Sequence, residues 1–579
     1  MKILIDSDEV LQQCNYVSIS QSMVDHHQFE IRQTLEDLGM AFNNILQAKS
    51  ETLIGKPVTI EFKDNEFNGI ITSVAIDRSA AGGSVLLITG YSPGIILDYG
   101  AHTRSFYENT LKQIVSIASE GFNEEFENEP GNKNKLKYVV QYREGNYQFM
   151  ARLAAAYGEW FFYDGKKLYF GKKPPEGELT ELMYGSDIQS LGIQVRAVPT
   201  NIEFVAYDYK GDQVLNKKPE YAKLEGVGGI AYTKSSNEIF AGSAKLPYNQ
   251  SMSDKDLEQL VKINGGASLS DLVCLQCTTT TEGIKIGGYV HVLDPRPGLL
   301  GGNDDYGKYI ITKVTHTFGI QGDQYDYSNF IEGIPSDVSH LPLYGSIHPP
   351  FCEVQLANVK KIDDEDQLGR VRVQFLWQGG QDMSPWIRVS SPYTGADKGV
   401  YMVPEIDDQV LVGFENNNPE RPFVLSGWYN AKSKPQYFDK DNYKKAIRTA
   451  GGNEILMNDK SGSESFGITC PKDVSITASG GKMTISADAE ISITSNKKDI
   501  TIDTPETITL HAKKIILQAD SEIQFEAPKI VSSASTDYKV SALKVTVEAD
   551  TTHTIKGGVS MDVDGGPKTN IKGGILKLN

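Results

Sequence analysis

The sequence contains few cysteines. Its 579 residues include five of them, at positions 14, 274, 277, 352 and 470. An odd and sparse set in a large chain is not the cysteine framework of a disulfide-stabilised domain. We therefore expect the protein to assemble in a reducing compartment.

Long hydrophobic segments are also missing. No stretch approaches the roughly 18 apolar residues that a membrane-spanning helix needs. The first residues, MKILIDSDEVLQQ, include early acidic residues and no long apolar core, so they do not match a signal peptide. If the protein is exported, we expect another machine to export it.

Positive charge is scarce. The formal net charge is −18, whereas a protein that binds nucleic acid needs clustered lysine and arginine to neutralise phosphates. We therefore expect no nucleic-acid partner. The negative charge favours solubility and identifies no partner by itself.

What the chain does contain is β-structure, divided among several domains. A single hydrophobic core rarely extends to 579 residues, so more than one domain is expected. The 39% hydrophobic content is slightly low and the 54 glycines are many, which is typical of thin β-structures. Strands are predicted at 58–62, 68–76 and 84–93, and further strands through 200–335.

Two helices and a hairpin are predicted between the first strands and residue 175. Residues 108–121 have apolar residues at helical spacing, with Gly121 as the expected C-cap. A second helix is predicted at 145–158. It is followed by the strand pair EWFFYDG and KLYFGK, a hairpin pattern.

A Pro- and Ser-rich segment at 335–350 is interpreted as a linker. The remaining boundaries place a β-module at 351–430, called the 351–430 module below, a polar linker at 431–470, and a repeat at 471–579. The preceding residues are 1–345.

The repeat consists of apolar pairs at i and i+2, separated by seven to nine residues. The pairs are Val474/Ile476, Met483/Ile485, Ile491/Ile493, Ile500/Ile502, Ile508/Leu510, Ile515/Leu517 and Ile523/Phe525. Nearer the end, Val547, Ile555, Val563 and Ile571 are eight apart, as are three Gly-Gly pairs. Period two indicates strands with one buried face, and glycine permits tight turns between them.

One such chain cannot enclose its own apolar row, because each unit offers only two or three inward side chains. Three chains wound about a common axis would bury the row and leave no open sheet edge. A single-chain parallel β-helix is the alternative, although its coils are usually longer, near about 20 residues per turn.

No motif in the sequence meets the requirements for catalysis or for cofactor binding. Gly90–Gly94 reads G-x-S-x-G, but Pro93 follows Ser92 and lacks the N–H that an oxyanion hole requires. The pair Cys274 and Cys277 falls on opposite faces of an expected strand. We expect no catalytic residue and no cofactor. The acidic run 363–366 is interpreted as a solvated hairpin turn.

The 351–430 module carries the most specific signal, in DQLGRVRVQFLW (366–377) and in the 384–430 segment. This sequence resembles the oligonucleotide/oligosaccharide-binding (OB-type) barrel of the VgrG spike proteins of type VI secretion systems and of contractile-phage spikes. Further matches are DHHQFE at 25–30, LLITGYSP, ENTLKQIV, VVQYREGNYQFMARLAAAYGEWFFYDG and IRTAGGNEILMND. The matching module residues are Gly369, Arg370, Pro404, Asp407, Asn418, Pro419, Arg421 and Pro422.

The resemblance implies a mainly β homotrimer. Residues 1–345, called the hub region below, would form a hub of two tube-like β-barrels, with short helices and a small α/β insertion near 105–175. Residues 351–430 would form an OB-fold collar, and 471–579 an intertwined triple-stranded β-helix needle. The two barrels per chain would give the trimer a pseudo-sixfold symmetry that matches a hexameric tail tube.

The resemblance also implies partners. These are a hexameric Hcp-like tail-tube protein, a PAAR-type tip protein, baseplate components, and effector and chaperone proteins. The expected docking edge for the tip protein is Ile575, Leu576, Lys577, Leu578 and Asn579, because a last turn leaves strand groups unpaired. Since no segment follows Asn579 in the sequence, no fused effector is expected.

His553 is a further candidate residue. It is in register with Val545, Met561 and Thr569, the first inward position of each eight-residue unit. Three His553 side chains in a trimer would converge, where they would bind an ion or form a hydrogen-bonded polar plug.

The resulting functional hypothesis is a non-enzymatic spike that punctures a target envelope and carries effectors. It would be assembled in the bacterial cytoplasm and then delivered by its machine. A receptor-binding tail fibre or spike, of a phage or an extracellular injection particle, is the alternative. A cell-wall hydrolase is a third class, for which no carboxylate pair is evident.

Overall fold

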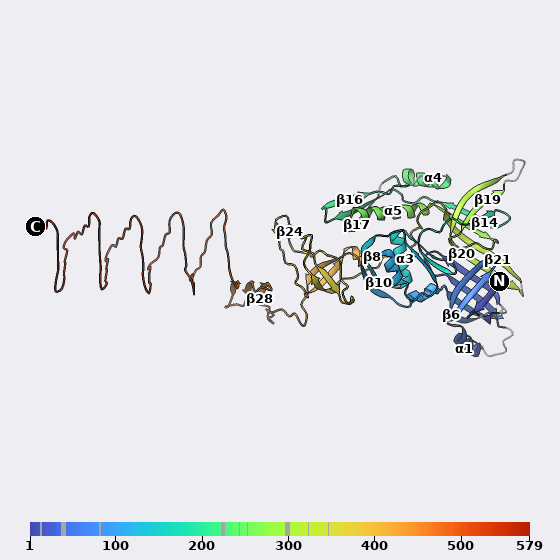
Figure 1. Cartoon of the computed structure of the whole chain (residues 1–579), viewed down its shortest axis with the longest axis horizontal. Coiled ribbons are helices and arrows are strands. Elements are labelled where there is room, and N and C mark those ends of the chain that lie inside the picture. The colour runs from blue at the N-terminus through green and yellow to red at the C-terminus, as the bar shows by residue number, and fades with distance from the viewer. Residues whose placement is uncertain are drawn as a thin grey trace. The chain divides into compact units, whose positions relative to one another are not determined.

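The computed structural model describes residues 1–7, 9–11, 14–35, 42–79, 83–221, 226–242, 244–251, 253–295, 302–321, 324–345 and 347–578. The chain divides into two compact units, Met1–Thr469 and Cys470–Asn579. As predicted, strands far outnumber helices in this described part (Figure 1). None of its helices has both the length and the apolar character needed to cross a membrane.

Most strands of the hub region belong to one large sheet. Among the described residues it has 13 strands, and along its main path they lie in the order β14-β18-β21-β20-β3-β4-β7-β6-β5-β1-β2, with β19 between β13 and β20. Their bounds are β1 (Lys2–Ile5), β2 (Glu9–Val10), β3 (Cys14–Ser22), β4 (Gln28–Thr34), β5 (Pro57–Phe62), β6 (Asn65–Ser79), β7 (Gly83–Tyr91), β13 (Leu179–Met183), β14 (Ile188–Val195), β18 (Val273–Thr279), β19 (Tyr289–Pro295), β20 (Asn303–Gln321) and β21 (Gln324–Pro335). The predicted strands at 58–62, 68–76 and 84–93 correspond to β5, β6 and β7.

The sheet has two halves that are distant in sequence. Strands β1–β7 form one half and β13, β14 and β18–β21 form the other. They join where β3 pairs antiparallel with β20, from Tyr16 opposite Gly319 to Ser22 opposite Lys313. Each half covers its own hydrophobic core. Whether each half closes into a tube remains a prediction.

Residues 102–171 contain two helices, at the two places where the sequence predicts helices, and two short sheets. Their elements are β8 (His102–Thr110), α2 (Leu111–Ala118), β9 (Glu125–Glu129), β10 (Lys135–Glu144), α3 (Asn146–Tyr157), β11 (Trp160–Tyr163) and β12 (Lys167–Gly171). Helix α3 ends at Gly158 with a φ of 70°, and β11 and β12 form the expected hairpin.

The predicted C-cap of α2 is wrong. The helix begins at a capping box of Thr110 and Gln113 and ends at Ser119, whose N–H bonds back to carbonyls in the last turn. Because those carbonyls are satisfied at Ser119, Gly121 lies beyond the helix, in the following turn.

Part of the region predicted as strands, 200–335, is helical. Its elements are β15 (Ile202–Asp208), β16 (Gln213–Lys217), α4 (Gly226–Lys234), the π-helix η2 (Ser235–Ile239), β17 (Ala244–Ser251) and α5 (Asp254–Ser270). Helix α5 begins at a capping box of Ser253 and Asp256. Its residues Leu257 and Val261 are four apart and buried, which is the helical pattern the sequence interpretation overlooked. Helix α1 (Phe42–Leu53) and the 3₁₀ helix η1 (Pro93–Asp98) were also not predicted.

The 351–430 module has a four-stranded antiparallel sheet in the order β23-β22-β26-β27. Its elements are β22 (Gln355–Lys361), β23 (Arg372–Phe375), β24 (Thr394–Gly395), β25 (Lys398–Gly399), β26 (Gln409–Phe414), η3 (Glu415–Asn417) and β27 (Pro422–Gly427). Its core is a cluster of buried valines with Ala357, Phe375 and Ile387. The segment predicted as a linker, 431–470, contains a second antiparallel sheet of β28 (Lys444–Arg448), β29 (Glu454–Asn458) and β30 (Ser465–Thr469).

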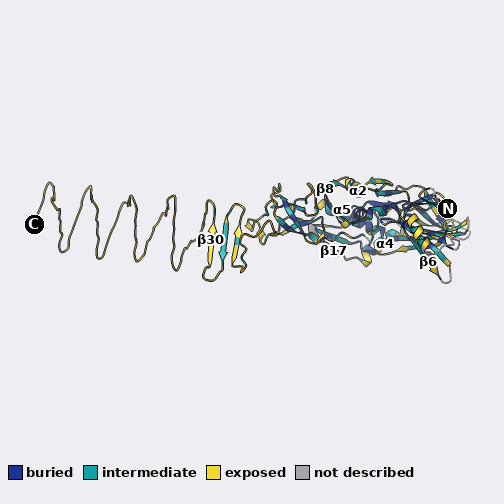
Figure 2. Ribbon diagram, turned by 90° about the horizontal axis from the view of Figure 1, so that it is seen from below, coloured by how far each residue is buried: buried dark blue, intermediate teal, exposed yellow. Residues whose placement is uncertain are grey.

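The C-terminal unit has no assigned strand in its described residues, 470–578. Its chain runs back and forth repeatedly (Figure 1), and every described residue after the half-buried Cys470 is exposed (Figure 2). The predicted apolar pairs, from Val474/Ile476 to Ile523/Phe525, are between 47% and 72% exposed. One copy of the chain therefore leaves this apolar row uncovered.

Two buried histidines in the hub region make its stability depend on pH. The His27 ring accepts a hydrogen bond from the Gln21 amide and donates one to the Ser22 carbonyl, and His316 bonds the Tyr327 hydroxyl. Burial lowers the pKa of each to about 3. The unfolded chain therefore binds more protons than the folded one between pH 6.5 and pH 3.

We expect the free energy of unfolding to fall as pH drops below about 6.5, by up to about 1.4 kcal/mol per pH unit for each histidine. Denaturant unfolding at pH 7.5, 6.0 and 5.0 measures this slope. His27→Gln should flatten it, whereas the exposed His348→Gln should not. Equal slopes in all three proteins would contradict the assignment.

Candidate functional site: the joint between the 351–430 module and the hub region

Gly369 and Arg370 shape one side of the 351–430 module. Gly369 has a φ of +67°, and a Cβ there would lie 3.0 Å from the Tyr401 ring. The Arg370 guanidinium donates to both oxygens of Asp364, at 3.0 and 2.5 Å, and to Asp366 at 2.6 Å. These bonds hold the pKa of Asp364 well below its usual range.

The Arg370–Asp364 pair is buried. Their side chains are 4% and 3% exposed, so the prediction of a solvated turn at 363–366 is wrong for Asp364. The turn is present, because the Gln367 N–H bonds the Asp364 carbonyl. The backbone N–H groups of Leu368 and Arg370 also point at the Asp364 carboxylate, which satisfies the buried charge from several directions.

The same arginine reaches into the hub region. Its Nη1 donates to the Tyr209 hydroxyl at 3.1 Å, and Lys210 forms an ion pair with Asp366. The Arg388 guanidinium lies 4.9 Å from the centre of the Tyr209 ring. The turn between β15 and β16 is thereby tied to the module.

The loop Asn418–Pro422 makes a second contact with the hub region. Asn418 holds the loop through its side chain, which accepts from the Glu420 N–H at 2.9 Å. The Glu420 carboxylate then accepts from the Val140 N–H at 3.3 Å and from Arg152 on α3 at 3.4 Å. Pro419 is buried and Pro422 begins β27.

Arg152 is the central residue of this second contact. It also bonds Glu144 at 2.9 and 3.0 Å and the Val140 carbonyl at 2.7 Å. Burial alone would lower its pKa, but Glu420 and Glu144 more than compensate and the pKa is raised. A buried cation bound by two carboxylates and a carbonyl holds the loop and the hub region in one specific arrangement, because removing any one partner leaves an uncompensated charge.

Gln378 and Arg372 make a third contact with the hub region. Gln378 donates to the Ser105 hydroxyl at 2.6 Å, and the Arg372 guanidinium lies 4.3 Å from the centre of the Tyr107 ring. Cys352 is buried in a small cluster with Tyr138, Val140 and Tyr142.

Pro404 and Asp407 are the two remaining residues of the predicted set, and Asp407 makes its contacts within the 351–430 module. Asp407 has a φ of 69°, donates its N–H to the Val359 carbonyl at 2.8 Å and pairs with Lys360 at 2.7 Å on the surface. The structure thus brings Arg370 and the loop Asn418–Pro422 to the hub region. Asp407 lies in a turn of the module, and Pro404 lies half-buried just before that turn.

The buried charges of the joint are paired with one another: Arg370 pairs with Asp364, and Arg152 pairs with Glu144 and Glu420. Sequence inspection missed Arg152 and Tyr209, since each is 150 or more positions from its partner in the module. The acidic Glu420, inside the matching loop, was the available signal.

The surroundings of Ser92 fit a structural role for its side chain. It is 1% exposed, its hydroxyl accepts from the His27 N–H at 3.2 Å, and η1 begins directly after it.

Cys274 and Cys277 lie on β18 as predicted, with Cys277 buried and Cys274 half-buried. Within the described ranges no cluster of three or more His, Cys, Asp or Glu side chains could hold a metal ion.

The candidates in the C-terminal unit remain predictions. His553 is exposed in the single chain, so its convergence with two copies depends on the trimer. In the expected docking edge, Ile575 and Leu578 are each 83% exposed and Leu576 is 57% exposed. Asn579 lies outside the described residues.

Two family models match the hub region and the module separately. Residues 37–322 match the phage tail baseplate hub (GPD) family. Residues 355–429 match the type VI secretion system/phage-baseplate injector OB domain. Together they match more than half of the chain.

Relatives and a solved structure agree with these matches. The chain is 23% identical over 497 residues to the type VI secretion system spike protein VgrG1c of Pseudomonas aeruginosa, covering 76% of this chain and 66% of that protein. It is 25% identical over 424 residues to the actin cross-linking toxin VgrG1 of Vibrio cholerae, covering 64% of this chain and 36% of that protein. The chain thus spans about a third of one relative and about two thirds of the other.

The fold also matches the structure of a Francisella PdpA–VgrG complex. The TM-score is 0.51 at 9% identity, over 81% of this chain and 80% of that chain. A phage-hub fold followed by an injector OB domain defines a phage-tail-like hub and spike protein. Within that class, the chain belongs to the VgrG family of spike proteins, as the resemblance of its 351–430 module implied.

The buried pair in the module gives a direct test. Asp364→Asn removes the charge that compensates Arg370, so we expect a loss of roughly 3 kcal/mol in the free energy of unfolding. The matched change Asp407→Asn affects an exposed pair and should cost less than about 1 kcal/mol. Urea unfolding followed by tryptophan fluorescence measures both, and equal losses would contradict the assigned role of Asp364.

Proposed function

We propose that this chain is the spike subunit of a type VI secretion machine, and that three copies form the spike. The spike would puncture a target envelope when the machine contracts. The names of the relatives as spike proteins support this role, as does the succession of hub and OB domain.

The exposed apolar repeat carries the proposal. In a single copy, Ile491 and Ile493 are 51% and 71% exposed, and every other pair is similarly open. Apolar area left in water costs about 25 cal/mol per Å², and this cost recurs at each unit of the repeat. Three intertwined copies would bury the row and leave lysine, aspartate, threonine and serine outside.

The rest of the molecule fits a mechanical role. The hub region would rest on a hexameric Hcp-like tube, and the OB module would form the collar that transmits force to the needle. Its fastening through Arg152 and Arg370 would resist movement between hub and collar. The expected edge at residues 575–579 would hold a PAAR-type tip, while effectors, chaperones and baseplate proteins would attach around the spike.

No catalytic activity is required of this chain. The toxin activity in the name of the Vibrio relative belongs to a protein of which the chain spans only 36%. We propose that this chain delivers cargo instead. The protein would assemble in the cytoplasm and leave the cell on the machine.

Mass in solution tests the proposal. The chain has a mass of 63.8 kDa, so native mass spectrometry should find a species of three times that mass. A monomer at micromolar concentration would contradict the trimer.

A paired substitution tests whether the repeat is responsible. Ile508→Asn with Leu510→Asn places two polar groups on the apolar row, and we expect it to weaken the trimer measurably. Thr509→Asn, on the opposite face of the same unit, should leave the trimer intact. If both variants behave alike, the apolar row is not the interface.

The alternative, a receptor-binding fibre, predicts a different phenotype. Deleting residues 1–340 should abolish binding to tail-tube protein if the chain is a spike. Retained tube binding, with a loss of cell adhesion on truncating the C-terminal unit, would favour the fibre.

A further inference from the structure

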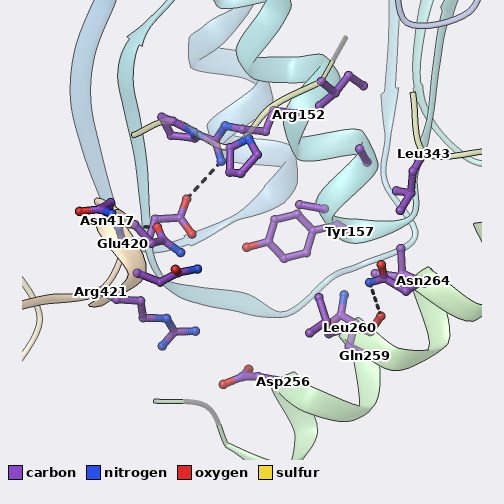
Figure 3. A pocket seen from close by; sticks show the side chains of 18 of the residues that line it. Arg152, Tyr157, Asp256, Gln259, Leu260, Asn264, Leu343, Asn417, Glu420 and Arg421 are labelled. Carbon is purple, nitrogen blue, oxygen red and sulfur yellow. Dashed lines mark hydrogen bonds and ion pairs between the residues drawn. The ribbon is translucent and has the colours of Figure 1, made fainter. Parts of the chain in front are cut away.

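A large open cavity lies beside the second contact between the hub region and the 351–430 module. Its volume is about 640 Å³, within the roughly 300–1,000 Å³ of ligand-binding pockets. Helices α3 and α5, residues 343, 347 and 349–351, and the loop 416–421 line it (Figure 3). All four belong to the same unit of the chain.

Much of the cavity wall is apolar, and part of it is open to solvent. Leu260 and Ile263 come from α5 and are half-buried and buried, whereas Leu343 and Phe351 are 53% and 67% exposed. Exposed large side chains around a concave site indicate a surface that a partner covers. An apolar part of a ligand would lie here.

The polar groups of the cavity divide into occupied and available ones. Each carboxylate accepts through one oxygen: Glu420 accepts from Arg152 and Val140, and Asp256 accepts from the N–H and hydroxyl of Ser253. In contrast, the Arg421 guanidinium lines the cavity without an ion-pair or hydrogen-bond partner in the described part of the chain.

Tyr157 adds a second available donor. Its ring stands in the middle of the cavity, with the hydroxyl directed toward the loop of Glu420 and Arg421 (Figure 3). Among the described residues this hydroxyl has no hydrogen-bond partner. A guanidinium and a hydroxyl next to apolar walls complement a carboxylate attached to apolar groups, because charge-assisted bonds to arginine are strong and directional.

We propose that this cavity binds an acidic, apolar peptide segment of a partner protein. A carboxylate of the segment accepts from Arg421 and Tyr157, and its apolar side chains lie against Leu260, Ile263, Leu343 and Phe351. The occupant would touch both hub helices and the module loop, and would therefore brace the joint. This site is independent of the spike role, since it requires neither the trimer nor the C-terminal repeat.

Fluorescence anisotropy with the full chain tests the proposal. The probes are two pools of labelled octapeptides with blocked ends, built from leucine, phenylalanine and glycine. One pool carries two aspartates and the other two asparagines at the same positions. We expect the aspartate pool to bind at least about tenfold more tightly, since loss of a charge-assisted bond costs about that factor.

Variants locate the site. Arg421→Gln should abolish the preference for aspartate, and Tyr157→Phe should weaken binding of the aspartate pool several-fold. Leu343→Asp should weaken it by introducing a like charge. The matched control Arg78→Gln, an exposed arginine that does not line the cavity, should bind as the parent does.

Three outcomes overturn the proposal. They are no binding by either pool to folded protein, equal binding of the two pools, and a preference that persists in Arg421→Gln. A peptide affinity that falls as the chain self-associates would also overturn it, and would assign the cavity to a second copy of the chain. Circular dichroism of each variant confirms folding.

Discussion

The apolar face of a β-strand is buried only when a second layer of the structure covers it. The architecture of this protein follows from which part of the structure supplies that second layer. In the hub region the chain covers its own faces. Strand β3 places Val17 and Ile19 inward with no exposure, and β20 returns some 300 residues later to extend the same sheet. In the C-terminal unit the same period-two pattern has no second layer within the chain. In the trimer proposed above, the other two copies would supply that layer, so that one sequence would combine a body that covers its own core with a repeat that needs copies of itself.

The joint between the hub region and the 351–430 module obeys a related rule for charge. Arg370 and Arg152 are both nearly removed from water, and each is surrounded by acceptors from two parts of the chain. Buried ion pairs contribute little to net stability, but their loss is costly, so they select one arrangement over its competitors. In the spike role proposed above, such a joint would resist movement between the hub region and the 351–430 module. The cavity beside it has the opposite character, with a guanidinium and a hydroxyl that no group of the described chain satisfies.

Much of the local structure was predictable from sequence. Alternation identified β5, β6 and β7, and helical spacing with a terminal glycine identified α3. The sequence predictions failed where the surrounding structure outweighed a local sequence signal, or where such a signal was not considered. Gly121 is suited to a C-cap, but α2 had already closed at Ser119. Helix α5 was taken for strands because its capping box at Ser253 was not weighed against the surrounding β-pattern. Asp364 looked like one acid of a solvated turn, and Arg370, six residues away, is what buries it.

The sequence by itself determined the mainly β character, the order of the parts, the VgrG resemblance of the 351–430 module and the repeat, because alternation, turns and motifs are properties of neighbouring residues. Only the tertiary structure decided that Arg370 meets Tyr209, that Arg152 meets Glu420, and that α3 and α5 enclose a cavity with the loop of Arg421. These pairs are separated by between 161 and 268 positions. Their contact depends on how whole domains pack, and no local pattern encodes that.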